Sequence, residues 1–148
     1  MQPSSRSFIY TSDIKWTEGK KGVLSSPDKP VIEVATPVEF GGPSGVWSPE
    51  DLLVSSVNSC VMTTFLYYIK RHNLSLVSYK STGKGILEKK KTGLSFSSIQ
   101  INPEIQMKKK SDIPMAEKLL KLSKERCLIS NSIKEEVILN IQNIDCEE

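Results

Sequence analysis

Residues 47–70, WSPEDLLVSSVNSCVMTTFLYYIK, predict the helix around which the fold is built. Ser48, followed three residues later by Asp51, is typical of a capping box, and Pro49 suits the first helical position. From Leu52 to Ile69 the sequence has no glycine or proline, its polar residues are small, and apolar residues occur on nearly every side. We therefore expect a largely buried helix at the centre of the core.

The segments before this helix predict a small meander of strands. Residues 8–16 alternate apolar and polar side chains, which is typical of a half-buried strand. The turn sequence EGKKG at 18–22 predicts a hairpin, and further strands are expected near Val23 and across Val31–Ala35. A glycine- and proline-rich loop, Phe40–Val46, then leads to the helix.

The segments after the helix predict a long hairpin and a second helix. Strands are expected at Leu76–Leu87 and Leu94–Met107, separated by the charged turn EKKKTG, and Pro103 favours an edge strand or a bulge. The stretch SDIPMAEKLLKLSKER at 111–126 predicts a helix. Its expected apolar face comprises Met115, Leu119, Leu120 and Leu122.

A last short strand is expected at Val137–Ile141, which gives the element order βββ-α-ββ-α-β. This order predicts an α+β fold with antiparallel sheets and a central buried helix. A length of 148 residues with 38% apolar content predicts a single domain, 1–148.

Charge and hydropathy narrow the function classes. A net charge of +3, spread over a mixed-sign sequence, gives no electrostatic reason to expect nucleic-acid binding. No run of 18 uninterrupted apolar residues occurs, and the N-terminal sequence MQPSSRSFIY lacks a hydrophobic signal core. We expect a soluble, cytoplasmic protein that does not bind a membrane.

Several motifs are missing from the sequence. His72 is its only histidine, and no CxxC, HExxH or paired His/Cys spacing occurs, so a metal site is not expected. Neither GxxxxGK[ST] nor GxGxxG is present, which argues against nucleotide binding. Three cysteines are too few and too scattered for a stapled secreted scaffold.

Two of the three cysteines have informative positions. Cys60 shares a helical face with Leu53 and Val57, where a buried structural thiol and a reactive thiol are both open interpretations. Cys127 follows Arg126 at the predicted end of the second helix, where nearby N–H groups and a cation favour a thiolate, although many such thiols are inert.

The local sequences around both cysteines resemble those of the OsmC/Ohr family of thiol-dependent hydroperoxide reductases. The family has an S/N-P-E-E/D/Q-L stretch at the start of its central helix, a cysteine ten residues after the glutamate, and a second cysteine in a C-P/L-I/V-S-N/Q motif. Here the stretch Ser48–Leu52, Cys60 and the stretch Cys127–Asn131 occupy those positions.

The resemblance implies an OsmC-like fold, an intertwined homodimer and two active sites at the subunit interface. Cys60 is then the peroxidatic thiol, which reduces an organic hydroperoxide or hydrogen peroxide and becomes a sulfenic acid. Cys127 resolves it to a Cys60–Cys127 disulfide, which a dithiol, lipoyl groups in better-known relatives, returns to thiols. The implied chemistry requires no metal, haem, flavin or other cofactor.

The resemblance also assigns Glu50 to the site. Glu50 and Cys60 are ten residues apart on one helix, which separates them by about 15 Å along the axis and about 80° around it. If both act in one site, the glutamate must come from the partner subunit. The alternative is that Glu50 is a first-turn acid that interacts with the helix dipole.

The chain departs from the family pattern in its cations. Peroxidase members use an arginine that pairs with the glutamate, but no arginine lies between Arg6 and Arg71 here. Lys20 and Lys21 fall in the turn where one branch of the family has its arginine, yet a lysine lacks the bidentate fork. Alternatively, both lysines simply belong to a solvated turn. Arg126 is the other candidate for the cation that replaces the arginine.

Two function hypotheses from different classes follow. The first is a cysteine-based peroxidase. The second is a noncatalytic or redox-sensing dimer of the same fold that binds a small ligand, and the missing arginine favours this second hypothesis.

Phe40 and Trp47 flank the glycine loop and are candidates to line an apolar pocket. Cys146 lies near the C-terminus, where chains usually fray, and is expected to be dispensable.

Overall fold

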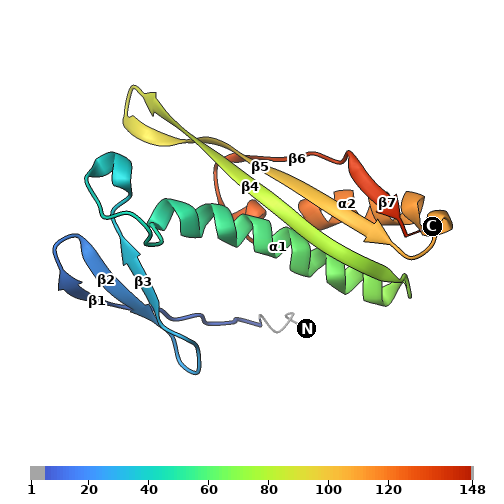
Figure 1. Ribbon diagram of the computed structural model, residues 1–148, viewed down its shortest axis with the longest axis horizontal. Coiled ribbons are helices and arrows are strands. Elements are labelled where there is room, and N and C mark those ends of the chain that lie inside the picture. Colours follow the sequence, from blue (N-terminus) through green and yellow to red (C-terminus); the bar gives the residue numbers. More distant parts are fainter. Residues whose placement is uncertain (1–5, 148) are drawn as a thin grey trace, which may run out of the picture. The chain divides into compact units, whose positions relative to one another are not determined.

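The computed structural model describes residues 6–147 (Figure 1). The chain forms two compact units, Met1–Leu52 and Leu53–Glu148. The first unit contains a small sheet and the start of the long helix, and the second contains the rest of that helix, the larger sheet and the second helix.

The first unit is built on a three-stranded antiparallel sheet in the order β1-β2-β3. Its strands are β1 (Asp13–Glu18), β2 (Lys21–Ser25) and β3 (Ile32–Ala35), and a short 3₁₀ helix, η1 (Val38–Phe40), follows them. The predicted hairpin at 18–22 and the predicted strand near 31–35 are confirmed.

The predicted half-buried strand over residues 8–16 is wrong in its bounds and in its burial. The strand begins at Asp13, and all six side chains of β1 are exposed. Its start is limited by its partner, because Asp13 pairs with Ser25, the last residue of β2. After Ser25 the chain turns, with Asp28 in the left-handed region (φ 61°), so residues before Asp13 have no ladder to join.

The long helix α1 spans Pro49–Arg71 and begins where the sequence predicts. The carboxylate of Asp51 accepts hydrogen bonds from the Ser48 N–H and hydroxyl, both at 2.9 Å, and the Ser48 hydroxyl accepts the Asp51 N–H at 3.1 Å. This reciprocal arrangement is the predicted capping box, and it satisfies backbone donors at the helix start.

The expectation of a largely buried helix holds for only one face of α1. Val57, Val61, Phe65 and Ile69 are buried at a spacing of four residues, whereas Leu66 and Tyr67 are exposed. The helix is long and apolar enough to cross a membrane by length and composition, although the core helix of a soluble protein passes the same test. Within one chain 22% of its most apolar stretch is buried, and Leu66 and Tyr67 are the exposed apolar residues between Leu52 and Ile69.

The larger sheet is built on a hairpin of two 15-residue strands, β4 (Leu76–Lys90) and β5 (Gly93–Met107). Two short strands, β6 (Glu136–Leu139) and β7 (Asn143–Cys146), pair one after the other with successive stretches of β5. The predicted hairpin is confirmed, and the α+β class with an OsmC-like fold is confirmed as well.

The C-terminal part differs from the predicted order, because two strands replace one and both run parallel to β5. The parallel direction follows from the connection, since helix α2 (Ile113–Arg126) carries the chain back before β6 begins. Cys146, which was expected in a frayed terminus, lies in β7 and pairs with Met107 of β5.

Pro103 lies in an inner strand and not at the predicted edge or bulge. It falls between the residues that pair with β6, which end at Ile101, and those that pair with β7, which start at Glu104. A residue without an N–H donor is tolerated at this interruption of the ladder.

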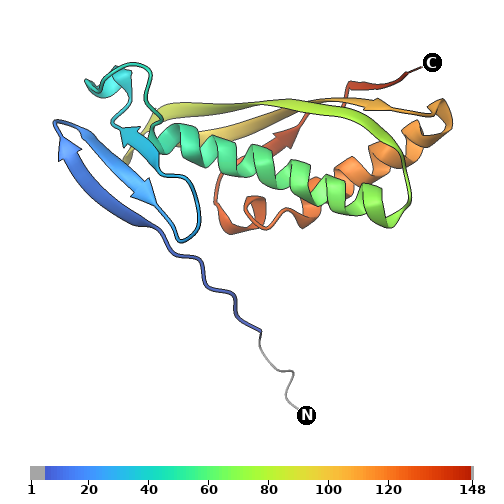
Figure 2. The same cartoon turned by 60° about the horizontal axis from the view of Figure 1, so that its bottom comes forward.

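Helices α1 and α2 cover the same face of the larger sheet, and the core lies between them and the strands (Figures 1 and 2). The buried residues of α2 are Ala116, Leu119, Leu120 and Ser123. Met115 is 37% exposed, whereas Leu122 is partly buried and packs against the core, so the predicted face was correct for Leu119, Leu120 and Leu122 and wrong for Met115.

Two glycines of β4 allow α1 to lie close to the sheet. A Cβ atom at Gly85 would lie 2.6 Å from Val54 Cγ2 and 2.6 Å from a ring carbon of Phe96. At Gly83 the nearest atom, Val54 Cγ1, would lie at 3.0 Å. The side chain of Asn58 also donates a hydrogen bond to the Ser81 carbonyl at 3.2 Å, which ties the helix to the strand.

We expect Gly85→Ala to destabilise the protein by ~1–3 kcal/mol, because the added methyl must displace well-packed side chains. Gly83→Ala is the matched control and should lose less, since its contacts are longer. The measurement is urea unfolding at one fixed protein concentration. Equal losses for both variants would contradict the close approach at Gly85.

Candidate active site

The structure brings Cys60 and Cys127 together within the second unit. Cys60 lies in the middle of α1 and is half-buried, whereas Cys127 is the C-cap residue of α2 and is fully buried (0% exposed). Both are free thiols. The two sulfurs are close enough to interact by hydrogen bonding, which couples their titration.

The segment after Cys127 wraps back around its sulfur. The Ser130 N–H, at the start of η3 (Ser130–Ser132), donates to Cys127 Sγ at 3.4 Å. The Asn131 N–H donates to the Cys127 carbonyl at 3.1 Å, and the Asn131 side chain donates to the Glu125 carbonyl at 3.0 Å. These bonds hold the backbone of residues 128–129 beside Cys60.

The pKa of Cys60 lies below that of an ordinary thiol. Burial opposes its thiolate, but hydrogen bonding from the Cys127 thiol, the Ile129 backbone, the Thr64 hydroxyl and the Leu128 backbone outweighs this penalty. The Thr64 hydroxyl donates its one hydrogen to the Cys60 carbonyl at 2.8 Å, so the Cys127 thiol and the backbone of residues 128–129 are the main donors to the sulfur. Cys60 is therefore the thiol that ionises first.

The pKa of Cys127 is raised, first by burial and next by its hydrogen bond to Cys60, although Ser130 offsets part of the rise. Cys127 thus retains its proton while Cys60 is a thiolate. The pair combines an accessible nucleophile with a protonated neighbour that points at it.

Glu50 is placed in the first turn of α1, ten residues before Cys60, which corresponds to about 15 Å of helical rise. The capping of α1 is done by Ser48 and Asp51, so Glu50 is not needed for it. Its Oε2 atom is buried and has no hydrogen-bond partner among residues 6–147.

The candidate cations have different surroundings. Lys21 forms ion pairs with Glu33 at 2.8 Å and Glu18 at 3.5 Å, and the hydrogen bond and charge of Glu33 chiefly raise its pKa. Lys20 donates instead to the Phe40 carbonyl at 3.0 Å. Arg126 ends α2 directly before Cys127. Lys20 is therefore the lysine of this turn that contacts the glycine loop.

Sequence reasoning did not identify Thr64 or the backbone of residues 128–129 as parts of the site. Thr64 follows Cys60 by four residues, so helical periodicity places both on one face and is the signal that could have revealed it. The backbone groups carry no such signal, because their position depends on the turn after α2.

One apolar side chain next to the thiols is exposed. Leu128 is 75% exposed although it directly follows the buried Cys127. Phe40 and Trp47 are also exposed within the first unit. Among residues 6–147, no group of three His, Cys, Asp or Glu side chains lies close enough to hold a metal ion.

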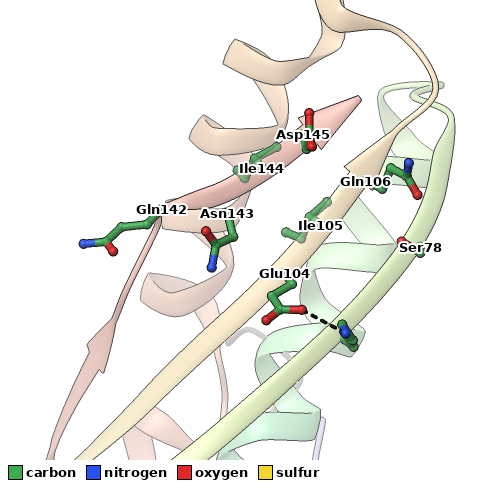
Figure 3. Close-up of a pocket in the computed structure, with 9 residues that line it drawn as sticks. Ser78, Glu104, Ile105, Gln106, Gln142, Asn143, Ile144 and Asp145 are labelled. Atoms are coloured by element: carbon green, nitrogen blue, oxygen red, sulfur yellow. Dashed lines mark ion pairs between the residues drawn. The ribbon is translucent and has the colours of Figure 1, made fainter. Parts of the chain in front are cut away.

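Figure 3 shows a separate groove of about 530 Å³ on the larger sheet, lined by β4, β5 and the segment around β7. Its side chains are mainly polar, including Gln106, Asn143 and Asp145, and Lys80 pairs with Glu104 across it at 3.1 Å. It contains neither thiol, so the redox chemistry has no place there.

An α+β domain with two facing thiols between its central helix and the end of its second helix defines a class of small thiol proteins. The family model for OsmC-like proteins matches residues 41–142. The chain belongs to the OsmC family.

Known proteins agree on the fold. An OsmC-like protein of unknown function from Vibrio cholerae superposes with a TM-score of 0.84 at 20% identity, covering 93% of this chain and 99% of that one. An organic hydroperoxide resistance protein OsmC from Legionella pneumophila gives 0.70 at 22% identity, covering 96% and 100%. The uncharacterized protein YmaD of Bacillus subtilis is 24% identical over 115 residues, 76% of this chain and 77% of its own.

We expect the alkylation rate of Cys60 to rise with pH through an inflection below the ordinary thiol value of ~8.5. Cys127→Ala should move this inflection upward, because it removes the hydrogen bond that favours the Cys60 thiolate. The measurement is the rate of iodoacetamide labelling of Cys60 by peptide mass spectrometry in a Cys146→Ser background. An inflection that Cys127→Ala leaves unchanged would contradict this coupling.

Proposed function

We propose that this protein is a thiol-dependent hydroperoxide reductase in which Cys60 is the peroxidatic thiol and Cys127 the resolving thiol. The observation that carries the proposal is the asymmetry of the pair. A half-buried thiol with a lowered pKa lies beside a buried thiol with a raised one. Such a pair suits one nucleophile and one resolving group.

The chemistry proceeds in three balanced steps. The Cys60 thiolate attacks the distal oxygen of the hydroperoxide, the O–O bond breaks, and the leaving alkoxide takes a proton, so that a sulfenic acid and an alcohol form. The Cys127 sulfur then attacks the sulfenic sulfur, which yields a Cys60–Cys127 disulfide and water. A dithiol reduces this disulfide by two exchanges and leaves as its own disulfide, and no bound cofactor takes part.

In this proposal, groups other than an arginine stabilise the Cys60 thiolate. The Cys127 thiol and the backbone at residues 128–129 supply hydrogen bonds to Cys60, which a thiolate needs when no guanidinium is available. The exposed Leu128 places an apolar side chain next to the thiols and favours organic hydroperoxides over hydrogen peroxide. Turnover of either peroxide by a dithiol is expected.

The proposal includes a homodimer. All side chains of β1 are exposed, among them Ile14 and Trp16, and α1 leaves Leu66 and Tyr67 uncovered. Apolar area of this extent supports coverage by a second copy. The Glu50 Oε2 atom is buried without a partner among residues 6–147 and needs a donor, which a second copy would supply. The family resemblance places this glutamate at the Cys60 site of the partner. We propose one domain, 1–148, acting in the cytoplasm.

A second candidate function is a noncatalytic or redox-sensing dimer that binds a small ligand. The absence of arginine between Arg6 and Arg71 favours it, since lysine cannot reproduce the bidentate contact to a carboxylate.

One equivalent of cumene hydroperoxide should lower the mass of the reduced protein by ~2 Da through a Cys60–Cys127 disulfide. Dithiothreitol should reverse this loss over many turnovers. Cys60→Ser should abolish turnover, and Cys127→Ser should trap a sulfenic acid that dimedone labels. Cys146→Ser is the control and should keep full activity; unchanged thiols in the parent protein would instead support the ligand-binding function.

Mixed dimers test whether Glu50 acts across subunits. Glu50→Gln and Cys60→Ser homodimers should both be inactive or nearly so. Mixing and re-equilibrating them in equal amounts should restore about a quarter of the parental activity, because half of the dimers are mixed and each has one intact site. The measurement is peroxide consumption before and after exchange of subunits.

The control for this experiment is a mixture of Cys60→Ser and Cys127→Ser proteins, in which no mixed dimer has an intact site when both thiols of a site belong to one chain. That mixture should not recover activity. A fully active Glu50→Gln protein would remove Glu50 from the site, and no recovery after subunit exchange in the Glu50→Gln mixture would exclude its action across subunits.

A further inference from the structure

The side-chain hydroxyl of Ser130 takes no part in the three steps of the proposed reaction. Ser130 begins η3, three residues after Cys127. Its Oγ atom is buried and has no nitrogen or oxygen partner among residues 6–147. Burying a hydroxyl without such a partner costs free energy, so this group is expected to have a use that offsets the cost.

The turn that carries Ser130 is held by other groups. The Ser132 N–H donates to the Ile129 carbonyl at 3.0 Å, and the Ser132 hydroxyl donates to the Leu128 carbonyl at 2.7 Å. The Asn131 N–H and side chain add the two hydrogen bonds already described. None of these four bonds uses the Ser130 hydroxyl, so the turn does not depend on it.

The Ser130 hydroxyl faces the sulfur of Cys127. Burial and the hydrogen bond to Cys60 raise the pKa of Cys127, whereas the hydroxyl of Ser130 and its N–H, which lies 3.4 Å from Sγ, lower it. A thiol sulfur is a weak acceptor, and hydrogen bonds to a charged acceptor are about twice as strong as neutral ones. The hydroxyl therefore interacts most strongly with Cys127 when that sulfur carries charge.

Charge reaches Cys127 in one step of the proposed reaction. In the reduced pair the charge belongs to Cys60, and Cys127 keeps its proton. Once Cys60 is a neutral sulfenic acid, the Cys127 sulfur loses its proton and forms the S–S bond, while the S–O bond breaks and the leaving hydroxide takes a proton to become water. Negative charge then develops on a buried sulfur beside Ser130.

We propose that Ser130 is a positioning residue of the resolving step, whose hydroxyl donates a hydrogen bond to Cys127 Sγ while Cys127 attacks the Cys60 sulfenic acid. This inference rests on the proposed function, because it takes the sulfenic acid on Cys60 from there. The N–H of Ser130 is a donor with a fixed direction, and the hydroxyl is a second donor that rotates toward the sulfur as charge forms.

Ser130→Ala tests the proposal in a single turnover with one equivalent of cumene hydroperoxide. The release of cumyl alcohol reports the attack by Cys60 and should keep its parental rate. Formation of the Cys60–Cys127 disulfide, followed by acid quenching and mass spectrometry, should slow about tenfold, because one hydrogen bond to a charged group is lost. The sulfenic acid should accumulate and become labelled by dimedone.

The pH profile separates this role from a structural one. Ser130→Ala removes a donor that favours the Cys127 thiolate, so the pKa of Cys127 should rise further. The rate of disulfide formation should then reach its inflection at a higher pH than in the parent protein. Ser130→Thr keeps a hydroxyl and should restore both the rate and the inflection.

The matched control is Ser132→Ala, which makes the same change in the same turn. It removes a hydroxyl that donates to the Leu128 carbonyl and not to a sulfur. This variant should lose more stability to urea than Ser130→Ala, because it loses a short hydrogen bond that shapes the turn. Its disulfide formation should keep the parental pH inflection.

A direct titration of Cys127 makes the test independent of peroxide turnover. With Cys60→Ser and Cys146→Ser, Cys127 is the one remaining thiol, and residue 60 is uncharged, as it is in the sulfenic acid. The Cβ chemical shift of Cys127, followed by NMR in cysteine-labelled protein, should titrate at a higher pH after Ser130→Ala.

An unchanged titration of Cys127 after Ser130→Ala would overturn the proposal, even where the parent protein turns over peroxide. Equal slowing by Ser130→Ala and Ser132→Ala, without a shifted inflection, would also overturn it and assign the effect to the turn. A parent protein that forms no sulfenic acid would overturn the proposed function and the resolving role together, whereas a shifted titration would still establish the contact between Ser130 and Cys127.

Discussion

The packing of one face of α1 on the larger sheet is the constraint on which the rest of the second unit depends. Val57, Val61, Phe65 and Ile69 bury their side chains in the core shared with β5 and α2. The glycines of β4 let the helix approach, and the hydrogen bond from Asn58 to Ser81 ties helix to strand. The packing of this face fixes the rotation of α1 and therefore the orientation of Cys60. Cys127 comes from the buried end of α2.

The thiol pair gains its asymmetry from the different positions of the two cysteines in their helices. Cys60 lies inside a helix, where its own backbone is already bonded, and it receives donors from a neighbouring segment. Cys127 lies at a helix end, fully buried, and Ser130 is its donor, with the Ser130 N–H at 3.4 Å. Burial without a strong donor keeps a thiol protonated, whereas several donors favour a thiolate.

Both units of the single chain leave apolar side chains exposed. The first unit exposes both faces of β1, and a three-stranded sheet of this size buries too little by itself for independent stability. The second unit leaves part of α1 uncovered in the same way. The secondary structure thus forms locally, while part of its apolar surface stays exposed in the single chain.

The sequence by itself determined the long helix with its capping box, the long hairpin, the second helix and the positions of both cysteines. These features depend on local periodicity, turn residues and caps, which act over a few residues. The resemblance to the family also followed from contiguous motifs around Cys60 and Cys127.

Only the tertiary structure decided which faces are buried and what surrounds each thiol. The start of β1 depends on where β2 ends, and the parallel direction of β6 and β7 depends on the α2 crossover. The donors to Cys60 come from a segment nearly seventy residues away, and backbone N–H groups have no sequence signature. Contacts of this kind are long-range, so no local pattern encodes them.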